Sequence, residues 1–306
     1  MLADAKSLQF KGGIEDAYSN LVDAGVVSDA LTTALASDPN SDVTVNASTT
    51  LNVTQANILA DVLSSKAGLK ATVDGLSADL VTLKTEKLYD DISITLTNAT
   101  GTDVSATNLS LIADATSSTV AISNAIDVTG SISDVQSLQG LSKVILPSDY
   151  TVELSDAGSV TVTDLSDIAG KTTGAVVVTN AITTSGTADQ VKAAFEASPT
   201  KVDVSVSAAV TVSDATDVAT ASAISNATNV TATFTSGVKD VFANLYTAGT
   251  DLVSAELIEV LNDDADTKVE VTDATGSVDA TDLSALIAVN STGSVTLSGA
   301  ATIAGS

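Results

Sequence analysis

The sequence contains no cysteine, histidine, tryptophan or arginine, and all 12 of its basic residues are lysine. Without thiolates and imidazoles, the chain cannot build the metal sites or the Ser-His and Cys-His nucleophile pairs that depend on them, and it forms no disulfide. Without arginine it also lacks the bidentate guanidinium groups that hold phosphates. These absences exclude most enzyme classes, so we expect a protein without catalytic activity.

Positive charge is scarce as well. The chain carries 38 acidic residues, which gives a net charge of −26, so nucleic acids and anionic membrane surfaces would be repelled. No stretch approaches the roughly 18 consecutive apolar residues of a membrane span, and we expect no membrane insertion. Aspartate provides 31 of the acidic residues. Because aspartate favours turns and helix starts, its abundance predicts many short elements joined by tight corners.

Aromatic residues make up only 3% of the chain, whereas hydrophobic residues make up 44%. The apolar side chains are therefore mainly Val, Ala, Leu and Ile, which pack well in a thin, regular core. A mean hydropathy of +0.33 argues against disorder.

A short motif recurs along the chain: a strand ending in Ser or Thr, then Asn, Asp or Gly, and usually Ala. Eight of the nine spacings between its marker residues lie between 24 and 32 residues. Such a period is typical of repeat architectures. The markers are Asn46, Asp74, Asn98, Asn124, Asp156, Asn180, Ala208, Ala232, Asp273 and Gly299.

Within each period, alternating residues such as Val176 and Val178 predict strands, and i, i+3, i+4 spacing such as Leu283, Leu286 and Ile287 predicts short helices. We therefore predict a β-rich repeat solenoid with short helices, a parallel β-solenoid or β-α solenoid of about ten coils of 24–32 residues. It would occupy residues 42–306, with a helical insertion around 236–266. Residues 1–41 do not match the repeat, and their apolar spacing predicts a helical cap or joint.

Four aspartates stand at corresponding strand-to-helix corners and are candidate metal ligands: Asp164, Asp214, Asp279 and Asp282. Carboxylates, carbonyls and water suffice to bind Ca²⁺. The glycine-rich calcium repeat is absent, however, and capping of helix starts explains the same residues. Calcium is accordingly a possible ligand, with capping as the alternative.

Two further polar sets have similar alternatives. Asp263, Asp264 and Asp266 form the densest acidic run, which is either a metal site or a solvated loop. The recurring Asn46, Asn98, Asn124 and Asn180 could bind a ligand in a row, but hydrogen bonding between successive repeats is the favoured interpretation.

The segments VTVTDLSDIAGKTTGAVVVTNA (160–181) and SVDATDLSALIAVNSTGSVTLSGA (277–300) resemble repeats of giant bacterial and cyanobacterial surface proteins, which include surface-layer proteins and repetitive adhesins. The resemblance covers most of residues 42–306 and carries no catalytic residues. It implies an extracellular, self-associating scaffold.

We therefore expect a structural protein of a surface layer, filament or adhesin stalk, whose partners are further copies of itself, with a surface glycan as a possible partner. Cations or salt would reduce repulsion between copies of such high negative charge. Two alternatives remain open: a phage fibre or virion decoration protein, and a carbohydrate-binding or carbohydrate-acting β-helix protein.

Overall fold

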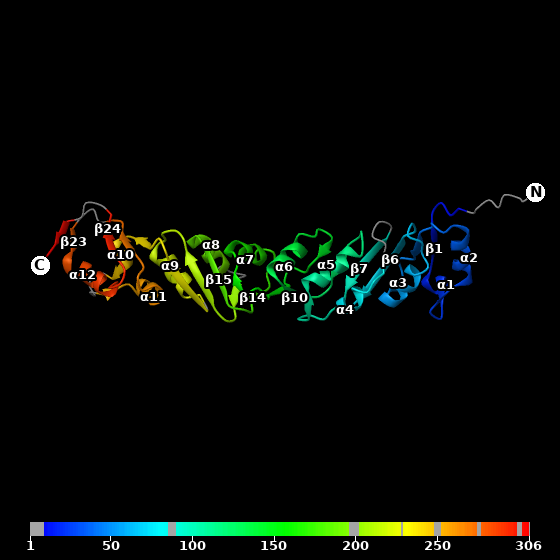
Figure 1. Cartoon of the computed structure of the whole chain (residues 1–306), viewed down its shortest axis with the longest axis horizontal. Helices are drawn as coiled ribbons and strands as arrows, with labels where there is room; N and C mark the ends of the chain where they lie inside the picture. Colours follow the sequence, from blue (N-terminus) through cyan, green and yellow to red (C-terminus); the bar gives the residue numbers. More distant parts are fainter. Residues whose placement is uncertain are drawn as a thin grey trace, which may run out of the picture. The chain divides into compact units, whose positions relative to one another are not determined.

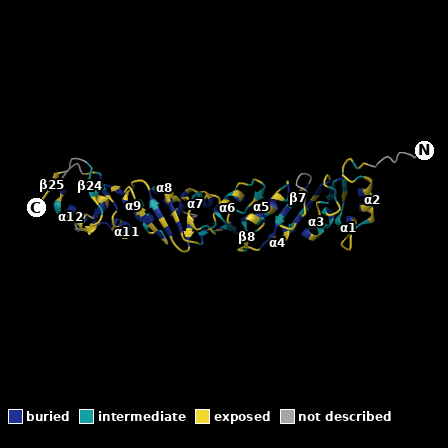
Figure 2. Ribbon diagram, in the orientation of Figure 1, coloured by how far each residue is buried: buried dark blue, intermediate teal, exposed yellow. Residues whose placement is uncertain are grey.

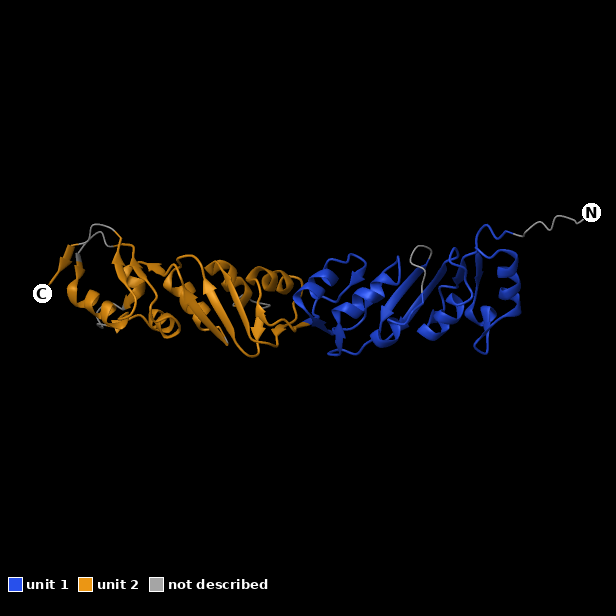
Figure 3. Ribbon diagram, in the orientation of Figure 1, with its two compact units in different colours: residues 1–151 blue, residues 152–306 orange. Residues whose placement is uncertain are grey.

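The computed structural model describes residues 9–84, 90–195, 202–227, 229–247, 252–273, 277–298 and 302–305. The chain divides into two compact units, residues 1–151 and 152–306, which Figure 3 shows in separate colours. The segment 1–41, expected to be a helical cap or joint, contains two helices from residue 9 onward and also contributes a strand to a sheet of unit 1. Residues 1–8 of that segment lie outside the described residues, as does the marker Gly299.

Unit 1 alternates short strands and short helices (Figure 1). The helices are α1 (Tyr18–Leu21), α2 (Asp29–Ser37), α3 (Val53–Ala60), α4 (Ser77–Leu80), α5 (Ala106–Asp114) and α6 (Ile132–Gln139). The strands are β1 (Ile14–Asp16), β2 (Val22–Asp23), β3 (Val26–Val27), β4 (Val43–Val45), β5 (Thr50–Leu51), β6 (Leu69–Gly75), β7 (Asp91–Leu96), β8 (Asp103–Ser105), β9 (Val120–Ile122), β10 (Asp127–Gly130) and β11 (Val144–Ile145).

A seven-stranded sheet runs through unit 1 in the order β1-β4-β6-β7-β9-β11, with β5 also paired to β6. Its strand pairs are parallel and in register, as where Ile94 lies opposite Val120. Strands β8 and β10 form another parallel pair, and β2 and β3 form a small antiparallel hairpin. Helices α4, α5 and α6 pack one against the next.

Unit 2 continues the same alternation. Its helices are α7 (Val162–Ala169), α8 (Ala188–Phe195), α9 (Val218–Ser225), α10 (Phe242–Leu245), α11 (Ala255–Asp263) and α12 (Ala280–Val289). Its strands, the first of which starts at the unit boundary, are β12 (Thr151–Leu154), β13 (Gly158–Ser159), β14 (Val176–Val178), β15 (Ile182–Gly186), β16 (Val202–Val204), β17 (Ala208–Val212), β18 (Val230–Phe234), β19 (Val238–Asp240), β20 (Tyr246–Thr247), β21 (Leu252–Val253), β22 (Val269–Val271), β23 (Ser277–Asp279), β24 (Val295–Leu297) and β25 (Thr302–Ala304).

Several parallel sheets follow one another in unit 2. Strands β12, β14 and β16 pair in chain order; β13, β15, β17 and β18 form a four-stranded sheet; and β19, β22 and β24 form a three-stranded one. Strands β23 and β25 pair in parallel, and β20 and β21 form an antiparallel hairpin. Helix α8 packs against α7 and α9, and α9 packs against α11.

The core of each unit consists of the inward-facing Val, Leu and Ile side chains of the strands together with the apolar helix faces. The alternation of buried and exposed residues along strands is visible in Figure 2. In α7, for example, Val162, Leu165 and Ile168 are buried, and Thr161 caps the helix by accepting the amide of Asp164. No described helix has the length and apolar character needed to cross a membrane.

The predicted solenoid is wrong. The described residues form an α/β fold of several parallel sheets interleaved with helices, which fits a Rossmann-like domain better than a closed solenoid. A closed solenoid would extend the same sheets with every coil, whereas here the β13-β15-β17-β18 sheet ends at β18 and another begins at β19. The marker residues of successive repeats also do not pair with one another, as a uniform coil would require. The marker Ala208 lies opposite Ile182 and not opposite the preceding marker, Asn180.

Gly13 shows how tightly the start of the unit 1 sheet is packed. Its φ is +75°, and an added Cβ would lie 2.8 Å from the carbonyl oxygen of Asp42. Gly12, directly before it, has a conformation open to other residues and nothing within 4 Å of an added Cβ. We predict that Gly13→Ala lowers the free energy of unfolding by about 2 kcal/mol through backbone strain and steric conflict. Gly12→Ala should change it by less than about 0.5 kcal/mol, and equal effects in chemical denaturation would contradict this account.

Candidate functional site

The four candidate calcium ligands all lie in unit 2 at helix starts. Asp164 accepts the hydroxyl of Thr161 through Oδ2 at 2.6 Å, and Asp279 caps α12 by accepting the amide of Thr281 at 2.7 Å. Asp282 lies in the first turn of α12, where a carboxylate interacts favourably with the helix dipole. Asp214 accepts the amide of Ala188, the first residue of α8, at 2.7 Å. Of the four, Asp279 caps the helix that follows it, whereas Asp214 accepts an amide of the preceding helix α8 and Asp164 lies inside α7, which Thr161 caps.

The structure does not gather these four aspartates into one ligand set. Among the described residues, no group of three or more acidic side chains is arranged to hold a metal ion. The calcium role of Asp164, Asp214, Asp279 and Asp282 therefore stays a prediction.

The acidic run at 263–266 lies at the end of α11 and also binds backbone amides. Oδ2 of Asp263 accepts the amide of Ala232 at 3.2 Å, and Oδ2 of Asp264 accepts the amide of Phe234 at 2.6 Å. Asp264 is buried, whereas Asp266 is exposed. The alternative of a wholly solvated loop is wrong for Asp264, because this residue is buried and its carboxylate accepts a backbone amide at the edge of β18.

The recurring asparagines join successive repeats, as the favoured interpretation predicts. Nδ2 of Asn124 donates to the carbonyl of Asn98 at 2.7 Å, and Nδ2 of Asn180 donates to that of Ser155 at 2.9 Å. Oδ1 of the buried Asn98 accepts the amide of Ser77 at 2.8 Å.

Several of these contacts share a feature that the sequence analysis did not predict. The first residue of four helices donates its amide to a side chain that follows 21 to 31 residues later in the sequence. Local caps serve the second and third amides of a helix, so the first amide needs a different acceptor. The pairs are Ser77 with Asn98, Ala188 with Asp214, Val218 with Asp240, and Phe242 with Asp273.

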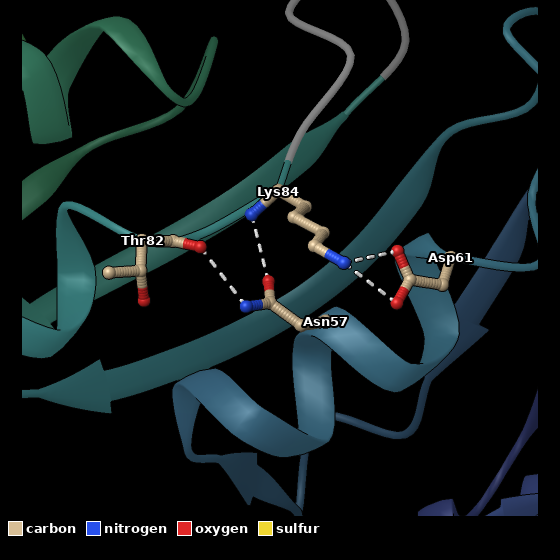
Figure 4. A network of polar contacts seen from close by, with 4 residues as sticks. All are labelled: Asn57, Asp61, Thr82 and Lys84. Carbon is tan, nitrogen blue, oxygen red and sulfur yellow. Dashed lines mark hydrogen bonds and ion pairs between the residues drawn. The ribbon is translucent and has the colours of Figure 1, made fainter.

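A hollow of about 380 Å³ lies beside α3 in unit 1, with Asp61, Lys84 and Asp90 among its lining residues. Figure 4 shows the polar network at its margin. Asn57 donates to the carbonyl of Thr82 at 3.1 Å and accepts the amide of Lys84 at 2.8 Å, while Nζ of Lys84 contacts both carboxylate oxygens of Asp61 at 2.7 and 2.9 Å. The side chains of Lys84 and Asp61 are 59% and 55% exposed, so their ion pair contributes little to stability. Oδ1 of Asp90, another lining residue, accepts the amide of Leu69. The polar side chains named here thus all make hydrogen bonds or ion pairs that hold the local structure together.

The chain contains the same structural module twice. Residues 13–45 in unit 1 and 237–271 in unit 2 each fold as strand, four-residue helix, antiparallel hairpin, nine-residue helix and parallel strand. The sequence signal is GIEDAYSNL (13–21) against GVKDVFANL (237–245), a similarity that a search for one uniform period overlooks because the copies lie far apart. We call these the first and second modules.

Matching hydrogen bonds hold the two modules. In the first module, Oδ1 of Asp16 accepts the amide of Ala17 at 2.8 Å and Nδ2 of Asn20 at 2.7 Å. In the second, Oδ1 of Asp240 accepts the amide of Val241 at 2.7 Å and Nδ2 of Asn244 at 2.8 Å.

A second match involves the aspartate at the end of the nine-residue helix. Asp38 accepts the amide of Phe10 at 2.9 Å, as Asp264 does that of Phe234. These paired contacts show that the modules are structurally equivalent.

The two modules differ in how far they are covered. In the second module Val238, Asp240, Val260 and Asp264 are buried, because α9 and β18 of the preceding repeat pack against it. The corresponding residues of the first module are only half-buried: Ile14, Asp16, Ala34 and Asp38. We call the half-buried surface of these residues and the neighbouring Thr33 the acceptor face.

The covering repeat lowers one pKa in the second module. Hydrogen bonds from Ser222 and then Asn226, both on the α9 side, hold the pKa of Glu259 below its usual value of 4.5. In the first module a hydrogen bond from Asn20, followed by one from the amide of Ala17, lowers the pKa of Asp16.

Comparisons with known proteins give no match, whether with protein families, curated proteins or solved structures. The resemblance to bacterial surface proteins therefore stays a prediction.

The equivalent aspartates provide a matched test of the inter-repeat contact. Asp240→Ala removes the acceptor of three donors, Val218 and Val241 amides and Asn244, so we predict a loss of about 2–3 kcal/mol in unfolding free energy. Asp16→Ala should cause a clearly smaller loss, because the described residues place donors on only one of its oxygens. Denaturant unfolding of both variants measures the difference, and a larger effect at Asp16 would refute it.

Acid should weaken the contact of α9 with α11. Since the folded pKa of Glu259 is lowered, its contribution is present above about pH 4.5 and is lost as the pH falls through the lower folded value. Glu259→Gln keeps an acceptor for Ser222 and Asn226 but does not titrate. We predict that the stability difference between wild type and this variant narrows on acidification, as measured by denaturant unfolding between pH 3 and 7; a constant difference would contradict it.

Proposed function

We propose that the protein is a non-enzymatic structural scaffold that self-assembles at the cell surface, as part of a surface layer, filament or adhesin stalk. The observation that carries this proposal is the contrast between strand edges that side chains of the same chain cover and strand edges that stay open within the described residues. We call the edges of β16 and β18 interior edges, and side chains cover them; several other strands at the ends of their sheets, β1 and β24 among them, pair on one side only within the described residues.

The interior edges are closed by carboxylate and carboxamide groups. Nδ2 of Asn229 donates to the carbonyl of Val204 on β16, and Asp263 and Asp264 accept amides of β18. Soluble proteins use such devices because unpaired strand edges promote association with other chains. The protein thus suppresses edge pairing at these positions.

The outer edges of β1 and β24 differ from the covered edges of β16 and β18. In the described part of the chain, each pairs with a strand on one side only, β1 with β4 and β24 with β22. The elements that flank β24 in the sequence, α12 and β25, carry exposed apolar side chains: Ile287, Val289 and Ile303. Open parallel edges with adjacent apolar surface favour association between copies through further strand pairing and helix packing.

The net charge of −26 opposes this association and makes it dependent on salt. At physiological ionic strength, charges are screened beyond about 8 Å, so close approach of copies requires screening by cations. Calcium, or another cation, would act in this way in our proposal, and a dedicated site is not needed for it.

We predict that the purified chain assembles with increasing protein and salt concentration. Sedimentation velocity together with negative-stain electron microscopy should show ordered oligomers or filaments, and the sedimentation coefficient should increase between 20 and 300 mM NaCl. CaCl₂ at matched ionic strength separates general screening from a specific requirement for calcium. Dispersed monomers under every condition would overturn the scaffold proposal.

A further inference from the structure

We infer that acid opens the joint between the four-stranded sheet β13-β15-β17-β18 and the second module, because carboxylates of the module hold this joint closed. The joint comprises the contacts of residues 216–234, which include α9 and β18, with residues 237–271. Opening uncovers an edge of β18 that side chains of the module otherwise cover. The inference does not rest on the proposed self-assembly, since the joint lies within one chain.

On the α9 side of the joint, two carboxylates of the second module accept hydrogen bonds from the preceding repeat. Oδ2 of Asp240 accepts the amide of Val218, the first residue of α9, at 3.0 Å. Oε2 of Glu259, on α11, accepts the hydroxyl of Ser222 and Nδ2 of Asn226. Both donors lower the pKa of Glu259, with Ser222 as the larger cause, so these bonds favour the charged carboxylate. Protonation of Glu259 therefore weakens its hold on α9.

On the β18 side, two further carboxylates accept amides of the strand that ends the sheet. Oδ2 of Asp263 accepts the amide of Ala232 at 3.2 Å, and Oδ2 of the buried Asp264 accepts that of Phe234 at 2.6 Å. A neutral carboxyl group is a weaker acceptor than a carboxylate, and its own proton needs an acceptor that an amide N–H cannot supply. Protonation in acid therefore weakens the cover over the edge of β18.

The four carboxylates of the joint make no ion pair within the described residues. Of the lysines on adjoining elements, Lys239 pairs with Glu270 at 2.9 Å, and Lys192 interacts electrostatically with Asp217, the cap of α9. An opposite charge would oppose proton uptake, and these carboxylates have none as a direct partner. The other charged groups of the joint and of the elements that pack against it are Asp189, Asp214, Glu256, Asp266 and Lys268.

Strand pairing across the joint is slight, and within the described residues it is the isolated bridge between Thr216 and Val238. Thr216 donates its amide to the carbonyl of Gly237 at 3.3 Å and accepts the amide of Lys239 at 2.8 Å. Strand β18, in contrast, pairs with β17 along its whole length and shares no sheet with β19. Helices α9 and α11 also pack against each other, and their apolar contact does not titrate. Acid therefore raises the population of open joints while the four-stranded sheet stays paired.

Opening leaves the amides of Ala232 and Phe234 as an uncovered strand edge. Such an edge pairs readily with another strand. The isoelectric point of the sequence is about 4.1, so the repulsion between copies also falls as the pH approaches this value. Acid thereby uncovers the edge and lowers the charge barrier to its pairing.

Hydrogen exchange of the full chain, resolved to single amides by NMR, tests the inference. The amides of Val218, Ala232 and Phe234 report on the joint. The amide of Ile182, which donates to the carbonyl of Ser207 at 3.0 Å, reports on wider unfolding of the sheet. Between pH 7 and pH 3.5 we expect the protection factors of the joint amides to fall at least about tenfold relative to that of Ile182. Unchanged protection of the joint amides, or a loss in step with Ile182, would overturn the inference and leave the scaffold proposal untouched.

A triple variant, Glu259→Gln with Asp263→Asn and Asp264→Asn, tests whether titration of the carboxylates causes the opening. Each substitution keeps an oxygen acceptor that does not titrate, so the acid response of the joint amides should fall below about threefold. Asp266→Asn, in the same loop as Asp264 but exposed, is the matched control and should keep the full response. Circular dichroism shows whether each variant is folded. A folded triple variant that responds like wild type contradicts the inference, and if it does not fold, the exchange pattern of the wild type decides.

Discussion

The structure depends on one kind of contact, the hydrogen bond between the first amide of a helix and an aspartate or asparagine of the following repeat. Each helix start leaves backbone amides without partners, and burying them unpaired is costly. Asn98, Asp214, Asp240 and Asp273 satisfy these amides from the next repeat. Since neither repeat is complete alone, this contact joins local folding to the stacking of repeats.

This contact gives a structural role to three of the aspartates, Asp214, Asp240 and Asp273. Aspartates that a composition analysis would assign to solvent or to metal binding are acceptors of backbone amides, as with the buried Asp240 and Asp264. Carboxylates make stronger hydrogen bonds than neutral acceptors, and a short side chain fixes the geometry. The cost is a high net charge, which the scaffold proposal connects to salt-dependent assembly.

In the duplicated module, hydrogen bonds to carboxylates also connect one sheet to the next. Within unit 2 it joins two different sheets, because Asp240 and Glu259 bind α9 while Asp263 and Asp264 close the edge of β18. In unit 1 the equivalent groups include Asp16, whose Oδ2 is unused among the described residues.

The sequence by itself determined the types of the elements and the source of the core. Alternating Val176 and Val178 lie buried on β14, Leu283 and Leu286 form the inner face of α12, and Asn124 bonds the preceding repeat as expected. These features follow from local periodicity and side-chain chemistry. Only the tertiary structure decided which sheet each strand joins, that β18 ends a sheet, and that Asp214 and Asp240 serve helices of another repeat. Strand pairing and capping between repeats depend on contacts between residues more than 20 positions apart, and a period in the sequence does not specify which partner satisfies a free edge or amide.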